Sequence, residues 1–202
     1  MLALSVYPII PNLNWALGYP SFFDIFLKSK GPLLTESLFY KLSLIVHVLS
    51  APTILFLGAL LIGAYFFQNL ALHKFLGKAY VILVLFFAAP SGIVIGFHPE
   101  GDPVSIYAFL ILGMSWFAVT LIGYQKVKAK EIWPHKYFMI ISYGLACSAP
   151  FQRIISAHYM DTLQNSFGVS GQFLYFSTII SSICIPMIGS LILIAMLKRK
   201  RV

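Results

Sequence analysis

The chain has 202 residues, of which 59% are hydrophobic and 10% are charged, and its formal net charge is +8. A soluble domain carries about 25% charged residues, so this composition excludes an ordinary soluble enzyme or nucleic-acid-binding domain and indicates a membrane protein. The basic excess then reports on membrane topology, and nucleic acid is not expected as a partner.

The first 35 residues are apolar but are interrupted by proline and glycine at short intervals. No stretch in this segment reaches the roughly 20 apolar residues that a helix needs to cross a bilayer. Its aromatic residues and two of its lysines, Lys28 and Lys30, suit the bilayer interface. We therefore predict an interfacial segment over residues 1–35, with a re-entrant segment as the alternative, and a single transmembrane domain over residues 36–202.

Five later stretches are apolar and long enough to cross a bilayer as helices. They cover residues 37–67, 76–97, 104–124, 135–158 and 172–197. The first is longer than a bilayer requires, so we expect this helix to tilt or to bend at Pro52. The pattern predicts an all-α, polytopic membrane helical bundle with five transmembrane helices.

Basic residues are distributed unequally between the two ends of these predicted helices. Ten of the 14 lysines and arginines fall in or beside the loops after the first and third stretches, or in the C-terminal tail. By the positive-inside rule this side is cytoplasmic, which places the N-terminus outside and the C-terminus in the cytoplasm. The lipid bilayer is accordingly the first expected partner.

The second and fourth predicted helices are similar to each other. Both begin with His-Lys, at His73 and His135, and both contain a small-small-Pro step that ends at Pro90 and Pro150. In both, another histidine follows the proline by eight residues. We interpret this as a parallel internal repeat of a helix and the span after it, an arrangement used by transporters, with a chance match as the alternative.

The five histidines fall at distinct predicted depths. His73 and His135 lie at the cytoplasmic ends of the second and fourth helices, and His98 and His158 lie at the outer ends of the same helices. His47 lies about 15 Å deep from the outer side, at a rise of about 1.5 Å per residue. The plainest interpretation treats most of them as interfacial helix-end residues.

The leading functional hypothesis is a haem-b-type redox or electron-carrier membrane protein. Two neutral imidazoles from different helices can ligate a haem iron, and an arginine can pair with a haem propionate. Arg153 lies inside an apolar stretch, where a charged side chain commonly marks a site. The candidate cofactor-binding residues are His47, His73, His98, His135, Arg153 and His158. Those of the outer side, His47, His98, His158 and Arg153, are preferred, and an additional, second haem between His73 and His135 is less expected.

Three other interpretations stay open. A zinc-dependent membrane hydrolase would use His47, His135 and His158 as metal ligands, and Ser43 lies one helical turn from His47. A cofactor-free accessory subunit of a respiratory or transport complex would need none of these residues. A small-molecule transporter would use the proline-bent, small-residue helices. The partners expected on these interpretations are other membrane-complex subunits or a quinone.

Two sequence patterns carry a family resemblance: H-K-x-x-G-K-x-Y-V from His73, and W-x-H-x-x-F-M-I-x-S-Y from Trp133. With Arg153 they resemble a membrane-protein family known as domain of unknown function 2306, over about residues 38–160. The resemblance implies a multi-pass protein of the bacterial inner (cytoplasmic) membrane and brings no established activity. The positions that match are His47, His73, Gly77, His135 and Arg153. His98 and His158 are not part of the pattern, which shifts weight toward His47 paired with His135 or His73.

Overall fold

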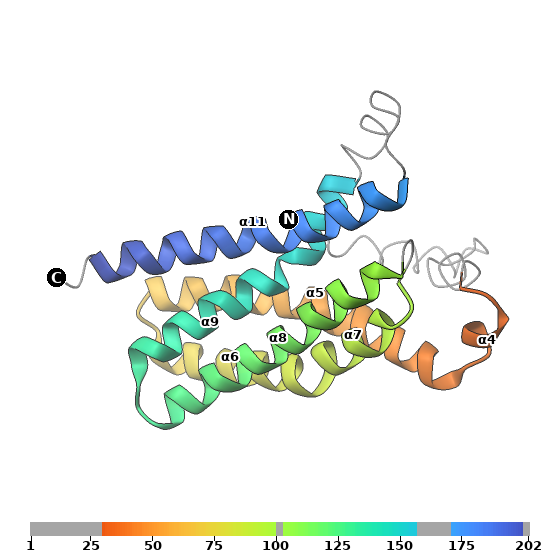
Figure 1. Ribbon diagram of the computed structural model, residues 1–202. Helices are drawn as coiled ribbons and strands as arrows, with labels where there is room; N and C mark the ends of the chain where they lie inside the picture. Colours follow the sequence, from red (N-terminus) through yellow and green to blue (C-terminus); the bar gives the residue numbers. More distant parts are fainter. Residues whose placement is uncertain (1–29, 100–102, 157–170, 200–202) are drawn as a thin grey trace, which may run out of the picture.

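The computed structural model describes residues 30–99, 103–156 and 171–199, and the regular elements in these ranges are all helical (Figure 1). They are α4 (Pro32–Thr35), α5 (Leu38–Phe66), α6 (Leu70–Leu83), the π-helical turn η2 (Val84–Ala88), α7 (Ala89–Gly96), α8 (Val104–Lys128), α9 (Ile132–Ala146) and α11 (Gly171–Arg199). After a turn at Cys147, residues 148–156 form a further helical stretch. Most of the predicted interfacial segment, residues 1–29, lies outside the described residues.

Five helical stretches in the described ranges are long and apolar enough to cross a bilayer, which confirms the all-α class and the number of spans. They run over Leu38–Phe66, Leu70–Gly96, Val104–Lys128, Ile132–Ser156 and Phe173–Arg199. The second and fourth begin earlier than we predicted. For the second, the Asn69 side chain accepts a hydrogen bond from the Leu72 N–H at 3.0 Å, and such a cap stabilises a helix start ahead of the most apolar run.

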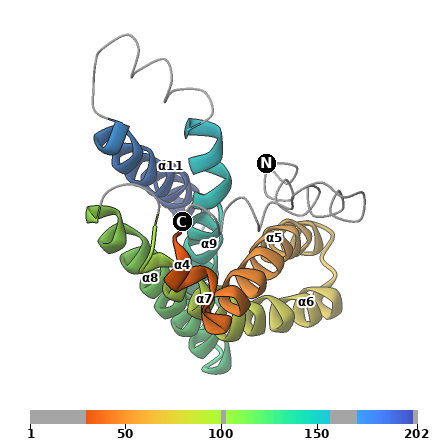
Figure 2. The ribbon, with the colours of Figure 1, turned by 90° about the vertical axis from the view of Figure 1, so that its right-hand side faces the viewer.

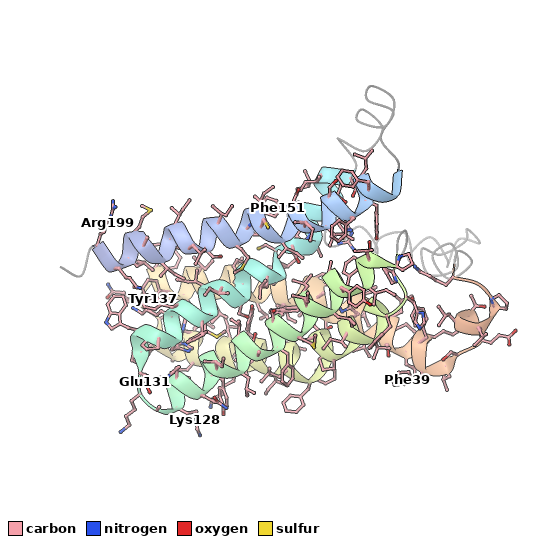
Figure 3. The ribbon with its side chains drawn as sticks, viewed as in Figure 1. Phe39, Lys128, Glu131, Tyr137, Phe151 and Arg199 are labelled. Atoms are coloured by element: carbon pink, nitrogen blue, oxygen red, sulfur yellow. The ribbon has the colours of Figure 1, made fainter. Side chains whose placement is uncertain are left out.

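The helix ends that carry most of the basic residues gather at one end of the bundle, which we call the basic end. The α5–α6 and α8–α9 turns and the C-terminal end of α11 lie there, whereas α4 and the start of α8 lie at the opposite end (Figure 1). Figure 3 labels Lys128, Glu131 and Arg199 at the basic end and Phe39 at the other. The orientation of the bundle in a membrane, with the N-terminus outside, stays a prediction.

The α5–α6 and α8–α9 hairpins are built alike, at an offset of 62 residues. Gln68 (φ 54°) and Lys130 (φ 61°) occupy the same left-handed position in the two turns. Each of the five backbone hydrogen bonds of the first turn, within residues 63–73, has a counterpart 62 residues later. An internal parallel repeat is therefore present. The two copies that the structure shows are the α5–α6 and α8–α9 hairpins, and the similar sequences lie in the second helix of each, α6 and α9. Our predicted unit starts with that helix and includes the span after it, and it stays a prediction because residues 157–170, which connect the second such unit, lie outside the described residues.

Packing inside the two hairpins uses the same positions with large and small residues exchanged. In the first hairpin, Leu61 Cδ2 lies 3.8 Å from where a Cβ on Gly77 would be. In the second, the equivalent positions hold Gly123 and Met139, and Met139 Sδ lies 2.9 Å from where a Cβ on Gly123 would be. One bulky side chain therefore fills the same space in each hairpin and lets the two helices approach closely.

Helix α9 occupies the middle of the bundle, as the view along the helices shows (Figure 2). It contacts α8, α5 and α11, and small residues permit these contacts. The Tyr143 ring of α9 rests on Gly58 of α5, and Gly144 of α9 faces Ser190 of α11. The second hairpin is thus fixed against the first by the α5–α9 contact.

Candidate functional site

Three histidines share one hydrogen-bonding pattern, in which the ring Nδ1 meets a backbone carbonyl oxygen. The distances are 3.0 Å from His47 to Ala88, 3.3 Å from His73 to Leu61 and 2.8 Å from His135 to Gly123. A carbonyl oxygen only accepts, so Nδ1 carries the hydrogen and Nε2 of the neutral ring keeps its lone pair. Metal-bound histidines normally have this arrangement, although it also serves to hold helices together.

His73 and His135 occupy equivalent positions of the repeated hairpins. Each imidazole reaches back twelve residues, from the second helix to the first helix of its own hairpin. Both side chains are half-buried at the basic end, and an electrostatic interaction links them. The structure therefore places His73 and His135 at the same end of the bundle, on the second helix of each hairpin.

His47 lies nearer the opposite end, against α7. Its Nδ1 is also 3.5 Å from Ser91 Oγ. A Cβ on Gly92 would lie 2.9 Å from His47 Cε1, so the missing side chain makes room for the ring. Pro90 lacks an N–H and follows the π-helical turn η2. Both features interrupt the regular backbone hydrogen bonds of the helix beside His47.

Arg153 lies on the helical stretch that follows α9, and its charge acts on the His47 imidazole. The structure thus places these two members of the predicted outer cluster near each other. The described residues hold two carboxylates, Glu36 and Glu131, and neither forms an ion pair with Arg153. Arg153 as a whole residue is exposed on its helix. His158, a third member of that cluster, lies outside the described residues.

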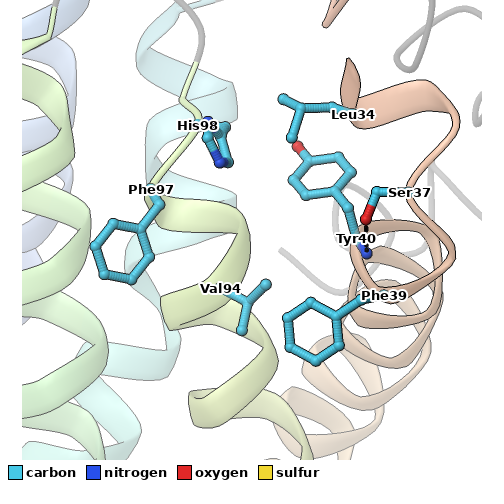
Figure 4. Close-up of a pocket in the computed structure, with 7 residues that line it drawn as sticks. All are labelled: Leu34, Ser37, Phe39, Tyr40, Val94, Phe97 and His98. Carbon is cyan, nitrogen blue, oxygen red and sulfur yellow. Dashed lines mark hydrogen bonds between the residues drawn. The ribbon is translucent and has the colours of Figure 1, made fainter. Parts of the chain in front are cut away.

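His98 lines a pocket of about 290 Å³ at the end opposite the basic end (Figure 4). The pocket opens between α4, α5 and α7, and its lining is mainly apolar. The exposed His98 ring meets the buried Tyr40 ring edge-on, with 5.9 Å between the centroids. Gly92, which faces His47, precedes His98 by six residues, which is about 9 Å along a helix. His98 therefore lies toward the same end of the bundle as His47 but at a different level.

The predicted zinc ligands His47, His135 and His158 are not assembled by the part of the chain that the structure describes. No three His, Cys, Asp or Glu side chains come together within the described ranges. His47 precedes the end of α5 by 19 residues, and His135 is the fourth residue of α9, so they lie on the order of 20 Å apart along the bundle. The Ser43 hydroxyl donates to the Phe39 carbonyl oxygen at 2.8 Å instead of facing a metal ligand.

Sequence reasoning missed a buried chain of hydroxyl groups between the hairpins. Tyr80 OH lies 3.0 Å from Ser142 Oγ, which lies 2.7 Å from Thr120 Oγ1. Thr120 donates to the Trp116 carbonyl oxygen at 2.7 Å. Since each hydroxyl has one proton, Ser142 then donates to Thr120 and Tyr80 donates to Ser142. Tyr80 and Ser142 are themselves related by the offset of 62, so the repeat was the available signal for this contact.

Comparison with known proteins gives a family but no closer relative. The family described as "Predicted membrane protein (DUF2306)" matches residues 44–193. No curated protein and no solved structure matches the chain. The matched range includes the three carbonyl-bonded histidines and Arg153.

Proposed function

This chain belongs to the DUF2306 family of predicted membrane proteins, and from that premise we propose that it is a haem-b-type electron-carrier protein. His73 and His135 would hold the haem, between the two hairpins at the basic end. The haem would supply one-electron transfer to and from a quinone or another subunit of a membrane complex. The bacterial inner membrane is the proposed location.

The observation that carries this proposal is that two imidazoles on different helices make the same hydrogen bond and have the same tautomer. Each holds its Nδ1–H on a carbonyl oxygen of its own hairpin, so each keeps a lone pair on Nε2. The second hydrogen bond of a metal-bound histidine fixes the ring orientation and raises its basicity as a ligand. Two such rings supply the donor set of a bis-histidine b-type haem.

Other residues near the pair suit the same group. A bound haem supplies reversible one-electron transfer. Lys74 and Lys78 follow His73 on α6 and offer positive charge to propionate carboxylates. Tyr80 and Ser142 lie two helical turns deeper, are fully buried and close the bundle beneath the histidines. Their packing limits access of water from the interior.

The test is a visible absorption spectrum and a haem extraction on protein purified in mild detergent from cells supplied with a haem precursor. We expect about one haem per chain, and an almost complete loss of it in His73→Ala and in His135→Ala. His98→Ala is the matched control, because this histidine is exposed and lies at the other end. That variant is expected to retain the wild-type haem content.

Haem-free wild-type protein, or haem retained in both His73→Ala and His135→Ala, contradicts the proposal. Circular dichroism of each variant separates loss of ligand from loss of fold. A haem-free protein that co-purifies with a stable partner would instead favour the cofactor-free accessory subunit, and one that accumulates a solute in vesicles would favour the transporter.

A further inference from the structure

Two lysines at the basic end rest on aromatic rings. Lys136 Nζ lies 4.7 Å from the Trp133 ring centroid and 4.9 Å from the Tyr65 ring centroid. Lys198 Nζ lies 5.2 Å from the Tyr137 ring centroid, and the Trp133 and Tyr137 rings are 6.2 Å apart. These five side chains form one continuous group, which we call the aromatic–lysine cluster.

Three helices contribute to the aromatic–lysine cluster at one level of the bundle. Tyr65 is in the last turn of α5, Lys198 is in the last turn of α11, and the other three residues are in the first two turns of α9. Figure 3 shows Tyr137 close to the terminal part of α11 that carries Arg199. Tryptophan and tyrosine are typical of the headgroup level of a bilayer, and lysine side chains extend their ammonium groups to the same level.

Neither lysine is neutralised within the part of the chain that the structure describes. Of the two carboxylates there, Glu36 is at the opposite end, and Glu131 pairs with Lys126 at 2.9 Å. An aromatic face orients an ammonium group but brings no negative charge. Tyr65 OH, 3.4 Å from Lys136 Nζ, is likewise neutral. Both ammonium groups therefore keep their charge available for an external anion.

On the N-terminal side of Lys198, α11 exposes a series of apolar side chains. Ile188, Leu191, Ile192 and Met196 each expose a little more than half of their surface. Their spacing places them along one side of the helix. A ligand with a phosphate at the cluster and hydrocarbon along this side would match both parts.

We propose that the aromatic–lysine cluster binds the phosphodiester headgroup of an anionic phospholipid, whose acyl chains lie along the exposed apolar side of α11. Lys136 and Lys198 contact the phosphate oxygens, and the rings hold both ammonium groups in place. Basic pockets between helix ends at the headgroup level bind anionic lipids in this way. The inference is independent of the proposed haem.

The test uses detergent-purified, delipidated full-length chain and measures bound lipid by native mass spectrometry after addition of phosphatidylglycerol. We expect one retained lipid per chain. Affinity is expected to fall about fivefold in Lys136→Gln and in Lys198→Gln, and about thirtyfold in the double variant. Lys136→Arg and Lys198→Arg keep the charge and should keep binding. Lys126→Gln is the matched control, since it removes the same charge from a lysine that already has a carboxylate partner.

Three comparisons decide the outcome. Equal retention of phosphatidylcholine, or an equal loss of phosphatidylglycerol in Lys126→Gln, shows general adhesion and overturns the proposal. Displacement of the lipid by millimolar inorganic phosphate identifies a free-phosphate site and also overturns it. Selective retention of phosphatidylglycerol that depends on both lysines supports it, and thermal unfolding of each variant verifies that the fold is intact.

Discussion

Gly58→Ala is expected to destabilise the bundle by about 1–3 kcal/mol, the usual penalty for overpacking a filled interior. A Cβ at this position would overlap the Tyr143 ring, because the ring rests directly on the α5 backbone. The ring has little freedom to withdraw, since Tyr143 OH donates to the Leu55 carbonyl oxygen at 3.2 Å. Thermal unfolding in detergent, followed by circular dichroism, should show a midpoint lowered by about 5 °C.

The control for this substitution lies on the same helix. A Cβ on Gly63 would meet no atom within 4 Å, so Gly63→Ala is expected to leave stability unchanged or to raise it by up to about 1 kcal/mol. The double variant Gly58→Ala/Tyr143→Ala should be less destabilised than the sum of its single variants, because the overlapping ring is gone. If Gly58→Ala and Gly63→Ala unfold at the same temperature, the described α5–α9 contact is wrong.

Ser142→Ala is expected to destabilise the protein by about 1–3 kcal/mol, because it leaves a buried donor without an acceptor. Tyr80 and Ser142 are 1% and 0% exposed, so water cannot replace the lost partner of the Tyr80 hydroxyl. The variant also removes the donor to Thr120. Chemical unfolding in mixed micelles, with the change in free energy as the readout, tests this expectation.

Two further variants give the Ser142 result a reference. Among the described residues, the Ser43 hydroxyl bonds to Phe39 of its own helix, so Ser43→Ala should cost a few tenths of a kcal/mol at most. The double variant Tyr80→Phe/Ser142→Ala also removes the Tyr80 hydroxyl, which Ser142→Ala alone leaves without an acceptor. It should therefore be less destabilising than the sum of its single variants. Additive losses would show that Tyr80 and Ser142 do not interact in the folded protein.

Sequence reasoning reached the spans, the grouping of basic residues and the presence of a repeat, and it named His73 and His135 among the candidates. It placed the outer histidines first, because it assigned depth without rotation around each helix axis. The structure puts His47 against Ala88 and His98 at a separate pocket. The hydropathy profile of a helix is the same however the helix is rotated about its axis. It therefore does not predict which side chains of one helix face the next helix.

The amino-acid sequence by itself determined that the chain forms five apolar helices with most of its basic residues at one end, because hydrocarbon length and charge at a bilayer surface act on each segment separately. Only the tertiary structure decided which residues meet: Tyr143 with Gly58, and Tyr80 with Ser142. Those contacts join residues 62 or more positions apart, and they depend on how large and small side chains interlock between helices that are equally apolar on every side.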